Sequence, residues 1–120
     1  MNSQEKLMRL ASSRISKDDS FMSYFLGKYL AFERISEDQM ISELNCSLAC
    51  YYKLALCKAP NPTANDFIQR IQRISEKTGV SVFGISKIIK RVYTINKLSD
   101  AQSQSFLMAA RDKKKNEDNS

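Results

Sequence analysis

The fold is decided by residues 67–92, which read FIQRIQRISEKTGVSVFGISKIIKRV and carry isoleucine or valine every three or four positions on both sides of Gly79. This period predicts two amphipathic helices, 64–78 and 82–95, because side chains three and four residues apart share one face of an α-helix. Gly79 marks the break, since glycine readily adopts the left-handed conformation that ends a helix. The stretch therefore indicates two neighbouring helices with buried faces rich in isoleucine.

Helical patterns continue outward from this pair along most of the chain. The expected helices are 4–16, 19–32, 36–44, 48–57, 64–78, 82–95 and a last one that begins at Ser99. Ser36 and Gln39 form a capping box, in which the hydroxyl accepts from the third amide and the glutamine side chain reaches back. Three glycines and two prolines are too few to provide the turns of a β-sandwich or barrel. The sequence predicts an all-α fold, a compact bundle of six to seven short helices.

A chain of 120 residues is expected to form one domain. Residues 1–17 are expected to be an N-terminal amphipathic helix or arm, with Leu7 and Leu10 on its apolar stripe. Residues 18–111 form the helical domain, and the wholly polar stretch 112–120 is expected to be disordered. No apolar run approaches the ~20 residues that span a bilayer, and the first residues lack a signal-peptide pattern. We therefore expect a cytoplasmic protein that does not engage membranes.

The middle of the chain carries the pattern of a known family. Residues 36–47, SEDQMISELNCS, give a serine, an acidic pair, a helix, a turn residue and a second serine, and residues 79–81 give a glycine-apolar-serine step. In this order and spacing, residues 36–95 resemble the Xre-type, lambda-repressor-like helix-turn-helix fold. The stretch 54–60, LALCKAP, is similar to a signature of a poorly characterised family of small bacterial proteins. The resemblance implies a helix-turn-helix core at 36–95 and a small regulator of transcription that binds DNA.

The helix expected to read DNA departs from the family's pattern. Side chains that read the major groove donate or accept hydrogen bonds at base edges, whereas Leu48, Ala49 and Cys50 occupy the first positions of this helix. The residues there that could hydrogen-bond are Ser47, Tyr52 and Lys53. We therefore expect contacts mainly to phosphates rather than sequence-specific readout.

The net charge of +6 is concentrated in residues 67–97, where seven basic side chains face one acidic residue, Glu76. The basic residues recur three and four positions apart on each of the two helices, so each helix carries a stripe. We expect the two helices to pool this charge on one exterior surface that attracts DNA phosphates or an acidic protein. The candidate nucleic-acid-binding residues are Ser47, Tyr52, Lys53, Lys58, Arg70, Arg73, Lys77, Lys87, Lys90 and Arg91. Stacking on a single strand would need an exposed ring among them, and Tyr93 is the ring best placed for it.

The same scaffold could instead be a protein-interaction module that does not bind DNA. The apolar residues of the 48–57 helix would then form a surface for an acidic or apolar partner, or for a second copy of the chain in a homodimer. These candidate partner-binding residues are Leu48, Ala49, Tyr52 and Leu56.

Enzymatic activity is not expected, because the chain has no histidine and no glycine-rich phosphate loop. Cys46, Cys50 and Cys57 lack the CxxC pairs or histidines that a zinc site uses, so we expect free packing thiols. No metal, cofactor or small-molecule substrate is therefore expected.

Overall fold

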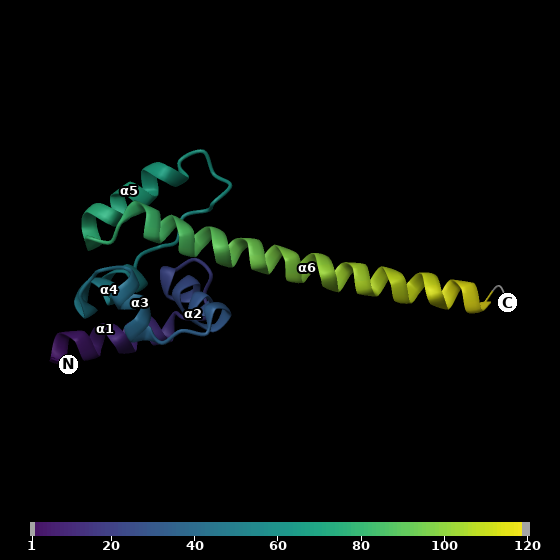
Figure 1. Ribbon diagram of the computed structural model, residues 1–120, viewed down its shortest axis with the longest axis horizontal. Helices are drawn as coiled ribbons and strands as arrows, with labels where there is room; N and C mark the ends of the chain where they lie inside the picture. Colours follow the sequence, from purple (N-terminus) through teal and green to yellow (C-terminus); the bar gives the residue numbers. More distant parts are fainter. Residues whose placement is uncertain (1, 119–120) are drawn as a thin grey trace.

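The structure is a computed structural model that describes the backbone of residues 2–118 and the side chains of residues 2–102. Six helices make up this described part of the chain, which contains no β-strand beyond one isolated bridge between Phe21 and Lys58 (Figure 1). The helices are α1 (Ser3–Arg14), α2 (Met22–Glu33), α3 (Glu37–Glu43), α4 (Leu48–Ala55), α5 (Phe67–Thr78) and α6 (Val82–Asp118). The prediction of an all-α fold is confirmed.

Short polar side chains fix the helix ends around the middle of the chain. The Ser36 hydroxyl accepts from the Gln39 amide at 3.1 Å, and the Gln39 side chain accepts from the Ser36 amide at 2.8 Å. The capping box is therefore confirmed. Asn45 takes up a φ of 52° between α3 and α4, and Gly79 takes up a φ of 78° at the end of α5. Both residue types tolerate this left-handed conformation. The chain therefore reverses direction at positions where the sequence has a residue suited to the turn.

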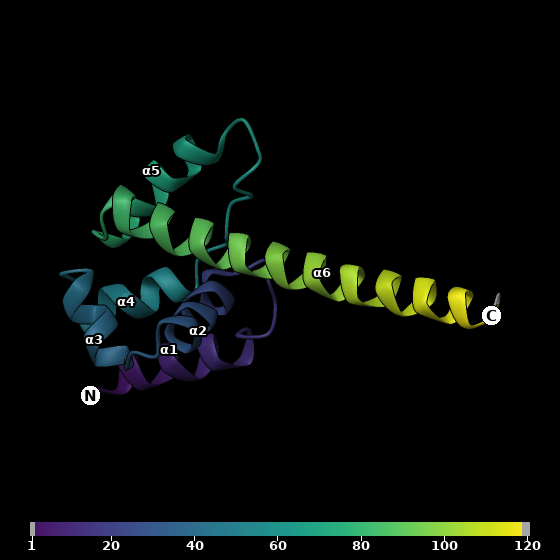
Figure 2. The same cartoon turned by 45° about the vertical axis from the view of Figure 1, so that its right-hand side comes forward.

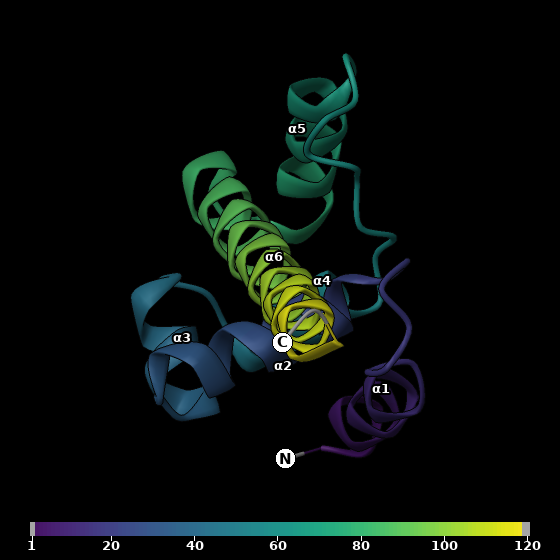
Figure 3. The ribbon, with the colours of Figure 1, turned by 90° about the vertical axis from the view of Figure 1, so that its right-hand side faces the viewer.

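The core is formed by α2, α4, α5 and the first half of α6. Helix α4 packs against α1, α2 and α5, while α6 packs against α2 and α5. In a view along α6, α5 lies on one side of it and α1 to α3 lie on the other (Figure 3). The most deeply buried aliphatic side chains include Leu26, Leu54, Ile71, Ile85, Ile88, Ile89 and Val92. The isoleucine stripes on both sides of Gly79 therefore face the core, as the spacing predicts.

Helix α6 approaches the α3–α4 turn closely at Gly84. A Cβ added at this glycine would lie 2.9 Å from the Leu44 side chain, which is shorter than carbon atoms tolerate without movement. The missing side chain thus lets the start of α6 lie directly against the turn. This contact packs the segment that follows Gly79 against the α3–α4 pair.

The prediction of a separate last helix from Ser99 is wrong, because α6 is one continuous helix. No glycine or proline occurs between Gly84 and Asp118, so nothing in this stretch forces a break, and Ser99 lies within the helix instead of capping a new one. The helix also includes residues 112–118, for which the sequence favours disorder. Val92 is the last buried side chain described on α6, and beyond the bundle the helix continues alone (Figures 1 and 2). The molecule consequently measures 68 Å along its longest axis.

Helix α1 presents a different face to the bundle from the one that the sequence favours. Leu7 and Leu10 are 67% and 59% exposed, whereas Ser12 is buried and Met8 packs against the core. The Ser23 hydroxyl donates to the Ser12 carbonyl at 2.6 Å and fastens α1 to α2. The apolar stripe of residues 1–17 therefore faces solvent.

Candidate nucleic-acid interface

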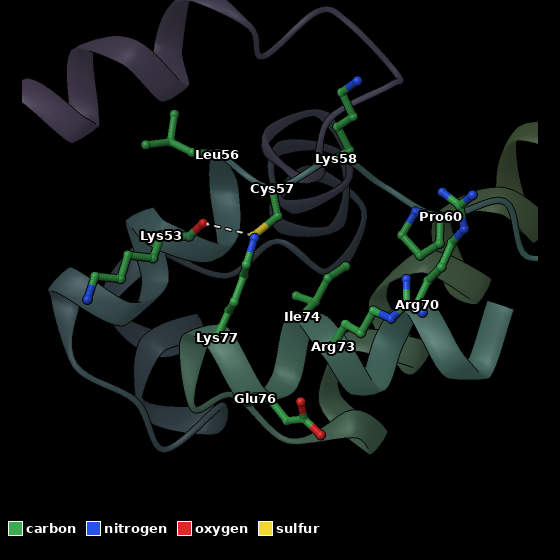
Figure 4. Close-up of a pocket in the computed structure, with 10 residues that line it drawn as sticks. All are labelled: Lys53, Leu56, Cys57, Lys58, Pro60, Arg70, Arg73, Ile74, Glu76 and Lys77. Carbon is green, nitrogen blue, oxygen red and sulfur yellow. Dashed lines mark hydrogen bonds between the residues drawn. The ribbon is translucent and has the colours of Figure 1, made fainter. Parts of the chain in front are cut away.

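The largest concentration of basic side chains lies in one cleft between the end of α4, the loop after it and α5 (Figure 4). This basic cleft has a volume of about 810 Å³ and five basic side chains against one carboxylate, Glu76. Its lining residues are Lys53, Leu56, Cys57, Lys58, Pro60, Arg70, Arg73, Ile74, Glu76 and Lys77. Half of the ten predicted nucleic-acid-binding residues thus come together here.

The buried stripe of α5 determines which of its residues line the basic cleft. Ile71 and Ile74 are buried, which turns Arg70, Arg73 and Lys77 outward towards the end of α4. Their spacing of three and four residues keeps the three cations on one face. The separation of buried isoleucines from basic residues on α5 therefore places three of the five cations along the basic cleft.

The loop that closes the basic cleft is held by backbone hydrogen bonds to the start of α2. The Met22 amide donates to the Cys57 carbonyl at 2.9 Å, and the Ala59 amide donates to the Ser20 carbonyl at 2.8 Å. These bonds fix the segment that carries Lys58. Lys53 and Lys58 are therefore presented from well-anchored backbone.

Most of the cleft's cations are free of carboxylate partners in the described part of the chain. Arg70 is the exception, because its Nε donates to Asp66 Oδ2 at 2.7 Å. This hydrogen bond lowers the pKa of the Asp66 carboxyl. Both side chains are largely exposed, so the pair contributes little to stability and leaves Arg70 accessible to an anion.

Cys57 lies within the basic cleft and is half-buried. Its thiol donates to the Lys53 carbonyl at 3.2 Å, and Lys77 extends from α5 towards it (Figure 4). Burial raises the pKa of this thiol, and the nearby charge of Lys77 opposes that rise without cancelling it. The thiol is therefore protonated at neutral pH and is a poor nucleophile. No group of three or more acidic or cysteine side chains in the described residues could hold a metal ion.

The remaining predicted cations lie elsewhere, on α6. Lys87, Lys90 and Arg91 line a second cleft of about 470 Å³ together with Phe83, Ser86 and Thr94, which we call the α6 cleft. Arg91 Nε donates to Glu33 Oε1 at 2.8 Å, and Lys90 lies 5.6 Å from the centre of the Phe67 ring. The two helices therefore divide their positive charge between two clefts, where we expected one shared surface.

Helix α4 is poorly exposed for a helix that would enter a DNA groove. Of its eight residues, all within the described part of the chain, Lys53 alone is exposed. Ser47 caps the helix by accepting from the Cys50 amide at 3.1 Å. Tyr52, expected at the surface, is buried, and its hydroxyl donates to Glu37 Oε1 at 2.6 Å. Helix α1 packs against α4, which explains why so little of α4 faces solvent.

The alternative partner-binding surface is covered in the same way. Leu48, Ala49 and Leu56 are half-buried, and Leu48 packs against the core. With Tyr52 buried among them, these four residues do not form an exposed apolar patch. The packing of α1, α2 and α5 against α4 decides this outcome, and no local pattern in 48–57 reveals it.

Phe83 is the site residue that the sequence analysis missed. It is 78% exposed, although it lies between the buried Val80 and Ile85. A signal was present in the spacing, because Phe83 is two positions from Ile85, and neighbours two apart on a helix point to different faces. The exposed ring stands beside the cations of the α6 cleft.

The fold and the two clefts define a small helical protein with a divided basic surface. Comparison of the chain with protein-family models, with curated proteins and with solved structures gives no match. Among the described residues, no helix combines the length and the apolar character that crossing a membrane requires.

Proposed function

We propose that this protein binds DNA through phosphate contacts made by the basic cleft. The observation that carries the proposal is the gathering of Lys53, Lys58, Arg70, Arg73 and Lys77 around one cleft with a single carboxylate. Cations that neutralise phosphates release condensed counterions from DNA, which provides affinity that does not depend on base sequence. The arginines add planar donors that match phosphate oxygens in pairs.

The proposed binding depends little on the base sequence of the DNA. Base edges are read by side chains on an element inside a groove, and α4 exposes only Lys53 among its described residues. The order of α3, the Asn45 turn, α4 and α5 supports a lambda-repressor-like core as part of this proposal. In such a core α4 serves as a packing helix. The role in transcription that the resemblance implies then depends on occupying DNA rather than on recognising an operator.

A salt titration of binding to a labelled random duplex tests the proposal. We expect binding at low salt and a slope of log K against log salt of about −3 to −4, which corresponds to roughly four phosphate contacts. Arg73→Glu with Lys77→Glu should weaken binding strongly and reduce the slope by about two. Fluorescence anisotropy measures both quantities.

The matched control is Lys6→Glu with Lys17→Glu, which changes the net charge equally at two exposed positions outside the basic cleft. This variant should retain most of the affinity. Equal losses in the two variants would show a non-local charge effect, and no binding even at low salt would remove the proposal.

A second candidate function is a protein-interaction module, and the exposed stripe of α1 favours it. Leu7 and Leu10 place two large apolar side chains in solvent on one helix, and exposed apolar side chains on neighbouring positions are a common basis of interfaces. If the partner is a second copy, Leu7→Gln with Leu10→Gln should convert a dimer to a monomer in analytical ultracentrifugation. A wild-type chain that is monomeric at high concentration would exclude the homodimer.

A further inference from the structure

The α6 cleft combines an exposed aromatic ring with a cluster of cations. Phe83 is the most exposed of the large apolar side chains described, and it lines this cleft with Lys87, Lys90 and Arg91. Phe83 and Lys87 are one helical turn apart, and Lys90 and Arg91 follow on the next turn, so all four side chains share one side of α6. A ring left in water beside a row of cations has no packing role within the described bundle.

We propose that the α6 cleft binds single-stranded nucleic acid, with an unpaired base stacked on Phe83 and the strand's phosphates on Lys87 and Lys90. This inference rests on the proposed function, because it takes nucleic acid as the ligand, and it adds the form of the strand and the residue that selects it. Aromatic side chains interleaved with cations are the means by which proteins bind single strands without reading sequence, since every base has a π-face. Bases within a duplex are stacked on one another and do not offer that face.

The contacts around the α6 cleft hold its cations beside Phe83 and leave them available to bind phosphate. Arg91 is paired with Glu33, and its side chain remains 55% exposed. Lys90 lies over the edge of the core at the Phe67 ring, 5.6 Å from its centre. Lys87 is exposed and has no carboxylate within ion-pairing distance among the described residues. Glu33 is the one carboxylate described against these cations, so the cleft keeps a positive excess that suits a phosphate backbone.

Tyr93, the ring that the sequence favours for stacking, is less suited to this role. It is half-buried, and the Lys97 ammonium already lies 5.0 Å from the centre of its ring. The face of the ring under this cation is therefore less open to a base. Phe83 has no such neighbour among the described cation–ring contacts, which is why the inference places the stacked base there.

The test compares an intact single strand of about twelve nucleotides with an abasic strand of equal length and charge, since sites of this class cover about 4–16 nucleotides. The wild-type protein should bind the intact strand at least about fivefold more tightly, which is the low end of the effect of one stacked base. Phe83→Ala should remove this preference while leaving the affinity for the abasic strand unchanged. Phe83→Leu, which keeps an apolar side chain but no ring, is the matched control and should behave like Phe83→Ala.

A direct readout is available because the chain contains no tryptophan. Phe83→Trp introduces the chain's only tryptophan, whose emission, excited selectively over that of the tyrosines, should be quenched by the intact strand and not by the abasic strand. Equal binding of both strands by wild type and Phe83→Ala, with no quenching, would overturn the stacking site and leave phosphate binding in place. Failure of both strands to bind at low salt would overturn the proposed function as well, so the two failures are distinguishable.

Discussion

At the scale of single residues, the bond between Tyr52 and Glu37 has the clearest energetic consequence. The Tyr52 ring is only 2% exposed, and its hydroxyl reaches the Glu37 carboxylate on α3 at 2.6 Å. Burial, followed by the hydrogen bond to Glu37, raises the pKa of Tyr52 to about 12. The bond joins α3 to α4 across fifteen residues of sequence and helps to fix the angle at which the two short helices meet.

Replacing Tyr52 with phenylalanine should lower the free energy of unfolding by about 1–2 kcal/mol, because it removes a hydrogen bond to a charged acceptor while keeping the ring. Urea unfolding at neutral pH measures the change. Tyr93→Phe, at a half-buried ring, is the control and should cost less. A loss for Tyr52→Phe no larger than that of the control would contradict the assignment of energy to this bond.

The same bond predicts a dependence on alkaline pH. The folded state holds the Tyr52 proton more tightly than the unfolded chain, so its contribution is fully present below pH 10 and is lost as pH rises towards about 12. Stability of the wild type should therefore fall across this window, and the fall should be shallower in Tyr52→Phe. Burial raises the pKa of Tyr51 too, so part of the slope should remain.

Residue-scale predictions from the sequence succeeded where the cause was local. The capping box at Ser36 and the left-handed conformation of Gly79 both depend on neighbours within four positions. The burial of Tyr52 could not be read in this way. Its partner lies on another helix, and its cover comes from α1, so only the tertiary packing decides its exposure.

At the scale of elements, α1 is packed through its weaker face. Met8 and Ser12 lie against the bundle, while Leu7 and Leu10 face solvent. A periodic pattern identifies which residues share a face, but it does not say which face the rest of the protein will cover. The sequence therefore located this helix, but its apolar stripe did not indicate which side the bundle would cover.

The orientation of α1 predicts an unequal response to polar substitutions. At protein concentrations where the chain is monomeric, Leu7→Gln with Leu10→Gln should change the free energy of unfolding by less than about 0.5 kcal/mol, because both side chains are then in water. Met8→Gln alone should cost about 1–2 kcal/mol, since it places an amide against the core. Urea denaturation distinguishes the two, and a larger cost for the leucine pair would show that α1 packs through its other face.

The difference between local and tertiary causes also explains which features of α6 the sequence predicted and which it did not. The isoleucine spacing of residues 82–95 predicts a helix correctly, and Ser99 with Asp100 has the composition of a helix start. A cap forms only where the chain leaves the helical conformation, and nothing between Gly84 and Asp118 requires it to do so. The basic cleft was predictable in its α5 residues, which share a stripe, but its separation from the α6 cleft depends on how the helices pack.

At the scale of the whole molecule, we expect that shortening α6 lowers the helix content of the protein without lowering its stability. Ending the chain after Gln102 should leave the thermal midpoint nearly unchanged, because buried side chains described on α6 end at Val92. The far-UV circular dichroism should nevertheless lose the signal of about sixteen helical residues. A fall in the midpoint of more than about 4 °C, the shift that roughly 1 kcal/mol produces in a domain of this size, would show that the distal half of α6 supports the bundle.

The close packing of Gly84 against Leu44 has a consequence for the direction in which the long helix α6 extends. A helix of 37 residues extends about 55 Å, and roughly 30 Å of it lies past residue 97. Because α6 is continuous past residue 97, the direction and the distance of its end from the basic cleft and the α6 cleft are fixed by the start of the helix. A change of about 10° in the direction of α6 at Gly84 would move that end by about 9 Å, because about 51 Å of helix lies between Gly84 and Asp118.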